Sequence, residues 1–278
     1  MLTKYNQKLS NTLIFLMLLA LSISNLYPLF FMFVNSLKSH TDYLKNPFNL
    51  QGLVLTWENY ATMISQFKIL NLFANSFIIS FTTIVLLLIF GIVASYAFAK
   101  LHFPGMNILY LLIISTMFIP VQVTIIPLYM LFSKLHLVNT YWAVIFTYVG
   151  MFLPEAILLM TSAFRGIPDE LLEAARLDGA GYFDILRQVI VPMGMPAILL
   201  CVIFYFIVTW NDLFTPLILL QSMDGRTVMV ALASLLSRYS GDPTLQFAGL
   251  VLAAIPAVLV YAIFQQFIVK GIGAGALK

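Results

Sequence analysis

Charged side chains are scarce in this chain. Asp, Glu, Lys and Arg make up 9% of the 278 residues, hydrophobic residues make up 62%, and the mean hydropathy is +0.99. Soluble domains carry roughly 25% charged residues, so a chain this apolar could not cover its surface with polar groups. The composition excludes a soluble globular protein and predicts an integral membrane protein.

Cysteine is nearly absent, and basic residues form no run. The single cysteine, Cys201, excludes an intramolecular disulfide and a cysteine-based metal cluster. The net charge of +3 is spread along the sequence, which argues against a nucleic-acid partner.

Catalytic motifs are also lacking. The sequence has no GxxxxGK[ST] phosphate loop, no HExxH and no nucleophile elbow, and its three histidines, His40, His102 and His136, are far apart. We therefore expect no catalysis, no metal and no cofactor in this polypeptide. An energy source for its work would have to lie on another chain.

Long stretches without charge predict an all-α membrane protein with six transmembrane helices. A helix needs about 20 apolar residues to cross the hydrocarbon core, and period-2 alternation is absent. We expect one transmembrane domain over residues 1–278, with spans at about 12–36, 71–98, 106–132, 140–164, 194–217 and 246–269. The apolar run at 227–237 is too short to span and predicts an interfacial or re-entrant helix.

Basic residues favour cytoplasmic termini by a small margin. With both termini inside, eight basic residues lie in the cytoplasm and six outside. Lys4, Lys8 and the small residues around Ala20 also fit a cleaved secretory signal. The apolar run continues to Leu37, however, which favours an uncleaved first span.

One segment gathers the charge that the rest of the chain lacks. Eight of the 14 basic and 11 acidic side chains lie between Arg165 and Arg187. Pro168 suits the first turn of a helix, the acidic Asp169 and Glu170 follow it, and Gly179 suits the left-handed residue that ends one. The pattern predicts a helix over 168–178 and a second over 182–190, stopping before Pro192 because a residue preceding proline avoids the helical region.

This helix–Gly–helix segment, residues 165–192, is called the elbow below. As a connector between the fourth and fifth spans it is longer than the chain requires. The alternative is a docking element, in which the small side chains of Ala174 and Ala175 permit close approach and the charged stripe of Asp169, Glu173 and Arg176 sets the register. Both readings are open on physical grounds alone.

The elbow resembles the cytoplasmic signature of binding-protein-dependent ATP-binding-cassette importer permeases. The signature pattern is EAA, three residues, Gly, nine residues, then apolar-x-apolar-Pro. Here it is Glu173-Ala174-Ala175, Gly179 and Val189-Ile190-Val191-Pro192, with valines in place of the commoner Ile and Leu.

The resemblance extends over nearly the whole chain, to the carbohydrate branch that includes the smaller permease of the maltose system. The matching pieces keep their order and spacing: Asn35–Lys38, Trp57–Tyr60, Ser95–Lys100, Ile119-Pro120, Ile126–Tyr129, Trp210–Leu213 and the glycine-rich tail Gly271–Lys278.

The resemblance implies a transport function and a set of partners. Two permease subunits, of which this chain is one and the other is usually a different chain, form the pathway in a bacterial or archaeal plasma membrane. Two ATPase subunits, which hold ATP and Mg²⁺, each receive one elbow, and an extracellular binding protein delivers a sugar or oligosaccharide. The implied coupling residues are Glu173, Ala174, Ala175, Asp178, Gly179 and Pro192. The tail near Gly273–Lys278 is similar to one that reaches the ATPases in some relatives.

Two acidic residues lie within or near spans. Ionisable groups in a membrane are costly and mark functional hypotheses. Glu155 follows Pro154 in the fourth span, and Asp212 follows Trp210 and Asn211 in the fifth. These four (Glu155, Trp210, Asn211, Asp212) are candidates for lining a solute pathway, with structural hydrogen bonding or interfacial anchoring as the alternative. A secondary carrier that uses the two acids for ion coupling is the competing function.

Overall fold

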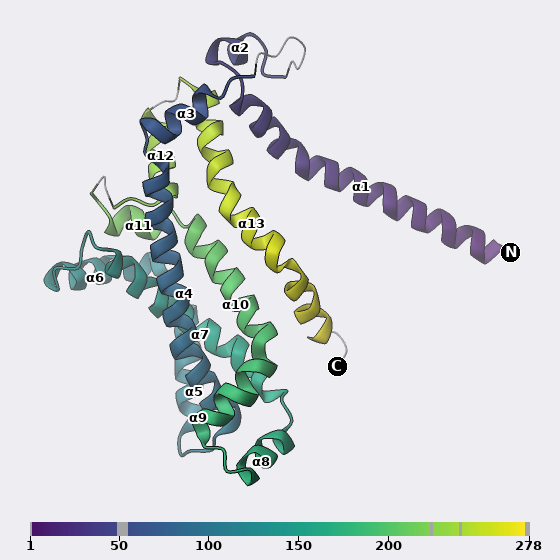
Figure 1. The fold of residues 1–278 in the computed structure, drawn as a ribbon, viewed down its shortest axis with the longest axis vertical. Coiled ribbons are helices and arrows are strands. Elements are labelled where there is room, and N and C mark those ends of the chain that lie inside the picture. Colours follow the sequence, from purple (N-terminus) through teal and green to yellow (C-terminus); the bar gives the residue numbers. More distant parts are fainter. Residues whose placement is uncertain (1, 49–54, 223–224, 239–240, 276–278) are drawn as a thin grey trace. The chain divides into compact units, whose positions relative to one another are not determined.

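The structure, a computed structural model, describes residues 2–48, 55–222, 225–238 and 241–275. Helices dominate these ranges, and no strand occurs in them, which confirms the all-α fold class. In chain order the elements (Figure 1) are α1 (Leu2–Ser36), α2 (His40–Lys45), α3 (Glu58–Ser65), α4 (Ile69–Lys100), α5 (Met106–Ser115), the 3₁₀ turn η1 (Thr116–Phe118), α6 (Val121–Lys134), α7 (Tyr141–Arg165), α8 (Asp169–Leu177), α9 (Tyr182–Ile185), the π-helical turn η2 (Leu186–Ile190), α10 (Val191–Asn211), α11 (Phe214–Leu219), α12 (Val228–Arg238) and α13 (Pro243–Gly275).

Five helices within the described residues are long and apolar enough to cross a membrane, or six if one bent pair counts as a single span. The five are Ser10–Ser36, Ile69–Lys100, Tyr141–Arg165, Tyr182–Asn211 and Pro243–Gln265. The short apolar run predicted at 227–237 is indeed a helix, α12.

The third predicted span, 106–132, is not one continuous helix. The segments Met106–Phe118 and Val121–Lys134 meet at an angle of 99°. Ile119 and Pro120 between them are both extended, with ψ of 108° and 141°. A residue before proline is pushed out of the helical region, so Ile119-Pro120 breaks the helix where hydropathy alone shows an unbroken apolar run.

The fifth span begins and ends earlier than predicted. The helix does not stop before Pro192 but runs from Tyr182 to Asn211, with the π-helical turn η2 just ahead of the proline. There the Val191 amide donates to the Leu186 carbonyl, five residues back. A wider turn leaves room for the proline ring, which would clash with the carbonyl four residues back in a regular α-helix.

Asp212 ends the fifth span, so the predicted limit at residue 217 is wrong. Its backbone turns extended, with ψ of 127°. Its carboxylate accepts hydrogen bonds from the Phe214 and Thr215 amides at 3.0 and 3.2 Å, which starts the separate short helix α11. A side chain that caps the next helix thus replaces continued helix.

The chain divides into two compact units. The first comprises residues 1–69 and 232–254, and the second residues 70–231 and 255–278. In the first unit Asn59 closes the turn after α1: its side-chain amide donates to the Ser36 and Lys38 carbonyls at 2.8 and 2.9 Å.

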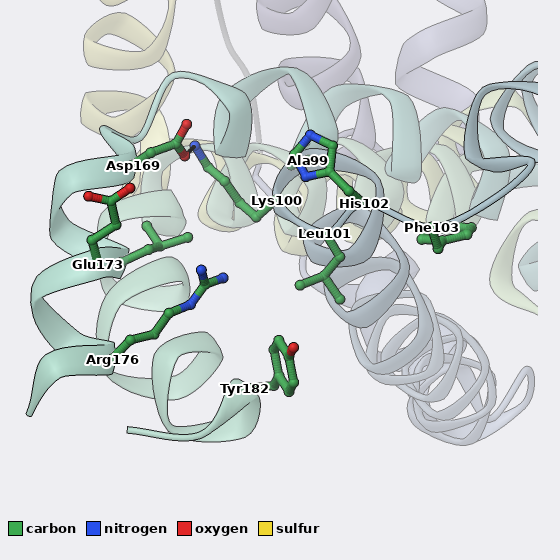
Figure 2. A pocket seen from close by; sticks show the side chains of 10 residues that line it. Ala99, Lys100, Leu101, His102, Phe103, Asp169, Glu173, Arg176 and Tyr182 are labelled. Carbon is green, nitrogen blue, oxygen red and sulfur yellow. Dashed lines mark hydrogen bonds and ion pairs between the residues drawn. The ribbon is translucent and has the colours of Figure 1, made fainter. Parts of the chain in front are cut away.

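The second unit contains the elbow at the ends of α4, α7 and α10 (Figure 1). Within it α8 faces the end of α4 and the residues that follow across a pocket (Figure 2). The elements of this unit are packed closely enough to exclude side chains at two glycines. A Cβ at Gly194 of α10 would lie 2.2 Å from Phe164 of α7, and a Cβ at Gly91 of α4 would lie 2.5 Å from Met160. Small residues permit such close helix approach in membrane proteins.

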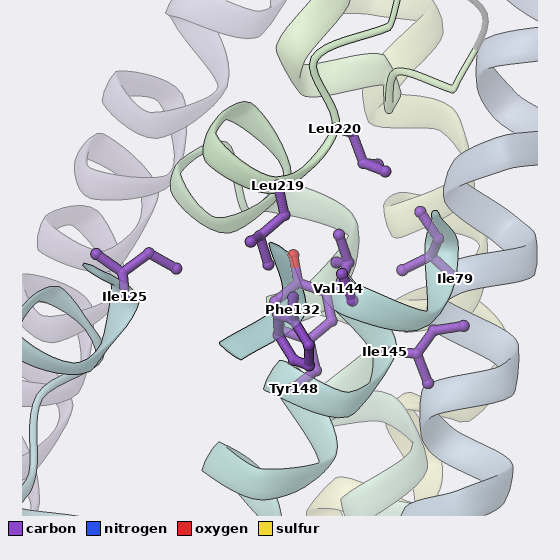
Figure 3. Close-up of a cluster of buried hydrophobic side chains, with 9 residues drawn as sticks. Ile79, Ile125, Phe132, Val144, Ile145, Tyr148, Leu219 and Leu220 are labelled. Carbon is purple, nitrogen blue, oxygen red and sulfur yellow. The ribbon is translucent and has the colours of Figure 1, made fainter. Parts of the chain in front are cut away.

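Buried apolar side chains from α4, α6, α7 and α11 form the core of the second unit (Figure 3). The cluster is Ile79, Ile125, Phe132, Ala143, Val144, Ile145, Tyr148, Leu219 and Leu220. It lies toward the ends of α7 and α10 that are farther from the elbow, so the elbow itself is supported by a separate set of contacts.

Candidate functional site

The first helix of the elbow, α8, forms where the sequence predicted it. Pro168 is the N-cap residue, Asp169 and Glu170 occupy the first turn, and Arg176 lies in the last. Acidic groups at the start and a basic group at the end both complement the helix dipole. Leu172 is buried beneath the helix and holds it against the rest of the unit.

A Schellman turn ends α8 at Gly179. The Ala180 amide donates to the Ala175 carbonyl at 2.9 Å, and the Gly179 amide donates to the Arg176 carbonyl at 3.0 Å. Gly179 has φ of +89°, in the left-handed region that side chains resist, although open space surrounds its α-carbon. Backbone conformation, rather than lack of room, therefore requires glycine here.

The start of α9 is fixed by a side chain. The Asp184 carboxylate accepts a hydrogen bond from the Gly181 amide at 3.0 Å, which satisfies one of the free donors at the helix start. The bend between α8 and α9 is thus held from both sides by local hydrogen bonds.

The elbow presents an apolar face that the sequence pattern only partly predicted. Leu177 is 89% exposed and Phe183 is 72% exposed, and Leu171 and Ala174 on α8 are exposed as well. Large apolar side chains this open in a charged loop mark an interaction surface. Sequence reasoning named Ala174 but missed Leu177 and Phe183, which lie on either side of the glycine turn.

Five of the six predicted coupling residues lie on α8 and its glycine turn, and the sixth, Pro192, lies at the far end of the elbow. Glu173, Ala174, Asp178 and Gly179 are exposed, and Ala175 is half-buried. Pro192 is exposed too, but it lies in the first turn of α10, beyond η2. It shapes the entry into the span and is no part of the bend at Gly179.

A pocket of about 430 Å³ separates α8 from the end of α4 (Figure 2). The charged stripe of the elbow lines one wall through Asp169, Glu173 and Arg176. Lys100 and His102 line the opposite wall. The stripe therefore borders the pocket on the side of α8, and Glu173 remains exposed there, as do the apolar side chains of Leu177 and Phe183.

Lys100 crosses to the elbow and anchors it. Its ammonium donates to the Ile167 carbonyl and to the Asp169 carboxylate, the latter at 2.7 Å. The Lys100 side chain is 4% exposed and that of Asp169 is 76% exposed. The carbonyl contact is thus the sheltered part of this anchor, and the ion pair is open to water.

The hydrogen bond and the charge of Lys100 hold the pKa of Asp169 below its ordinary value of 3.8. A carboxyl group whose pKa is lower in the folded state stabilises the fold above its ordinary pKa. This contribution disappears as the pH falls through the lowered value. The ion pair is therefore fully formed at neutral pH.

Glu155 lies half-buried in α7, opposite Cys201 and Tyr205 of α10. Tyr205 is buried, and its hydroxyl lies close to the Glu155 carboxylate without meeting standard hydrogen-bond geometry. A chain of aromatic rings, Tyr148, Phe152 and Tyr205, runs beside the acid with centroid separations of 5.8 and 5.3 Å. The acid, the hydroxyl and the rings make a polar-aromatic strip along the α7–α10 pair.

Asp212 and Trp210 are engaged within the chain. The Tyr148 hydroxyl donates to Asp212 at 2.8 Å, in addition to the two backbone amides that the carboxylate caps. The Trp210 ring is 2% exposed and lies against Phe73 and Phe206. Asn211 is exposed, with its side-chain amide donating to the Ile207 carbonyl. The structure thus brings Asp212 and Glu155 to the two ends of one aromatic strip, and neither is near the elbow.

The predicted glycine-rich tail is described only in part. α13 continues to Gly275, and residues 276–278 lie outside the described residues.

Relatives with known names match almost the full length of the chain. The arabinooligosaccharides transport system permease AraQ of Bacillus subtilis is 31% identical over 274 residues, which is 98% of this chain and 96% of that protein. The diacetylchitobiose uptake system permease NgcG of Streptomyces coelicolor is 30% identical over 264 residues, which is 94% of this chain and 87% of that protein.

The fold is also found in a solved structure. A chain of a bacterial ABC transporter involved in alginate import superposes with a TM-score of 0.83 at 23% identity, covering 94% of this chain and 97% of that one. The profile of the binding-protein-dependent transport system inner membrane components matches residues 88–273, which include the whole elbow. The chain belongs to this family, and it is a transport component of an ABC importer, not an enzyme.

Proposed function

We propose that the elbow is the surface through which this permease receives work from a separate ATPase. The observation that carries the proposal is the open apolar face of Leu171, Ala174, Leu177 and Phe183 on a segment that is otherwise charged. A bend that is already held by local hydrogen bonds suits docking in a groove, because it loses little conformational entropy on binding. Two ATPase subunits, which bind ATP and Mg²⁺, would each take one elbow, one from this chain and one from a second permease chain.

We further propose that the solute is a sugar or oligosaccharide brought by an extracellular binding protein. The named relatives reported above serve arabinooligosaccharides and diacetylchitobiose. A second chain of similar fold, with a TM-score of 0.65 at 14% identity, comes from an alginate transporter in complex with a periplasmic protein that holds an alginate pentasaccharide. The strip of Glu155, Phe152 and Tyr205 supports a polyhydroxylated solute, since sugars bind to aromatic faces flanked by hydrogen-bonding groups. The family and the basic residues favour a bacterial or archaeal plasma membrane with both termini cytoplasmic.

The test is purification of the tagged chain from its native membrane in mild detergent, with mass spectrometry of the proteins that accompany it. We expect a P-loop ATPase, a second permease and a binding protein.

Leu177→Asp or Glu173→Lys should lose the ATPase and keep the second permease, because each variant changes an exposed surface and not the core. Leu44→Asp, at an exposed leucine on α2, should retain every partner. An ATPase that stays with Leu177→Asp and Glu173→Lys would remove the elbow from the docking surface. Uptake driven by an ion gradient without any ATPase would favour a secondary carrier.

A further inference from the structure

Lys100 connects α4 to the elbow through contacts that the covalent chain does not provide. The elbow is continuous with α7 at one end and with α10 at the other, whereas α5, η1, α6 and α7 separate it from α4 in sequence. Lys100 is the last residue of α4, and its ammonium reaches both the Ile167 carbonyl and the Asp169 carboxylate.

The two contacts of Lys100 differ in strength. Ile167 is buried, and the Lys100 side chain is 4% exposed, so the bond between them is sheltered from water. Asp169 is 76% exposed, and an ion pair open to solvent contributes little. Removing the ammonium would leave the Ile167 carbonyl without this donor in a buried place, which is costly. Removing the Asp169 charge would cost little, because that ion pair is open to water.

A second basic side chain makes the reverse contact, from α7 to α4. Arg165, the last residue of α7, places its guanidinium 3.5 Å from the Phe98 carbonyl of α4 and 5.3 Å from the centre of the Tyr110 ring. Farther up the same pair of helices, the Ser95 hydroxyl donates to the Ile157 carbonyl at 3.2 Å. α4 is therefore held to α7 through Ser95 and Arg165, and Lys100 adds the contacts that reach beyond the end of α7 to Ile167 and Asp169.

We infer that Lys100 is a positioning residue that makes α4 follow the elbow when the ATPase displaces it. The inference rests on the proposed docking of the elbow. It adds the contact through which a displacement of the elbow reaches α4, a helix that does not adjoin the elbow in sequence. Without the ammonium, the elbow would still dock, but α4 would stay with α7 through Ser95 and Arg165 and would no longer follow the displacement of α8.

The experiment measures one distance within the assembled transporter. Spin labels are placed at Val93→Cys on α4 and Glu170→Cys on α8, both exposed, in a Cys201→Ala background that removes the buried native thiol. The distance is recorded without nucleotide and in the ATP–vanadate trapped state, with the ATPase content of each sample checked. The variants are Lys100→Met, Lys100→Arg and Asp169→Asn.

The native lysine should give the same distance in both states, because α4 and the elbow move together. Lys100→Met should give a different distance in the trapped state while the ATPase remains bound. Lys100→Arg and Asp169→Asn should behave as the native protein, since each keeps a cation at the Ile167 carbonyl.

Two results would overturn the inference. One is a distance in the protein with native Lys100 that changes between the two states. This result does not depend on whether any variant assembles. The other is a Lys100→Met protein that keeps the native distance in both. Either result, with ATPase bound, leaves the docking proposal intact, whereas absence of the ATPase from the native sample refutes docking itself.

Discussion

At the scale of single residues, Gly179 decides the shape of the elbow. Its φ of +89° lies in the left-handed region, which is strained for residues that have a Cβ. No neighbouring atom would touch a Cβ added at this position. Gly179→Ala should therefore destabilise the bend by about 1–2 kcal/mol without any clash. Gly179→Asn should cost less, because asparagine tolerates the left-handed region. Amide hydrogen exchange of residues 174–181 measures the difference, and equal protection in the alanine variant and the native chain would contradict the assignment of strain to φ.

At the scale of helices, the contact of α7 with α10 depends on Gly194. A Cβ there would lie 2.2 Å from the buried Phe164 ring. Gly194→Ala should lower stability by about 1–3 kcal/mol, the usual cost of overpacking. The same substitution in a Phe164→Leu background should cost less than it does alone, because the two positions share one space. Thermal unfolding in detergent of the two single variants and the double variant measures this coupling, and purely additive losses would place the strain elsewhere.

Helices with strong local signals could be predicted from the sequence, and those set by context could not. α8 follows from Pro168, the acids after it and Gly179, all of which act within a few residues. The sequence did not show that the helix breaks at Ile119-Pro120 but continues through Pro192. The two prolines look alike in sequence, and only at the second does a π-helical turn absorb the ring.

The candidate sites show the same division. The coupling signature located the elbow, but the directions of Leu177 and Phe183 depend on how the bend is set by hydrogen bonds on both sides of Gly179. Asp212 was a pathway candidate because of its charge. Its engagement by the Tyr148 hydroxyl, 64 residues away in sequence, is a tertiary contact that no local pattern indicates.

At the scale of the whole molecule, Glu155 is the pathway candidate whose carboxylate the structure leaves least committed to the fold. It lies about 15 Å along α7 from Arg165, at a rise of about 1.5 Å per residue. Glu155→Gln should reduce uptake of the sugar that accompanies the binding protein on the order of tenfold, the loss of one charged hydrogen bond. ATPase binding should be unchanged, and Glu58→Gln on α3 serves as the exposed control. Full uptake by Glu155→Gln would remove the acid from the pathway.

The π-helical turn at Leu186–Ile190 holds one residue more than the α-helical turn it replaces. The wider turn takes up that residue without the rotation of about 100° that a further residue adds in a regular α-helix. The elbow therefore leaves α10 at the angle it would have if the residue were absent and the helix regular. A one-residue deletion within this turn would leave the direction of the elbow unchanged, whereas the same deletion farther along α10 would rotate the elbow by about 100° relative to the rest of the span.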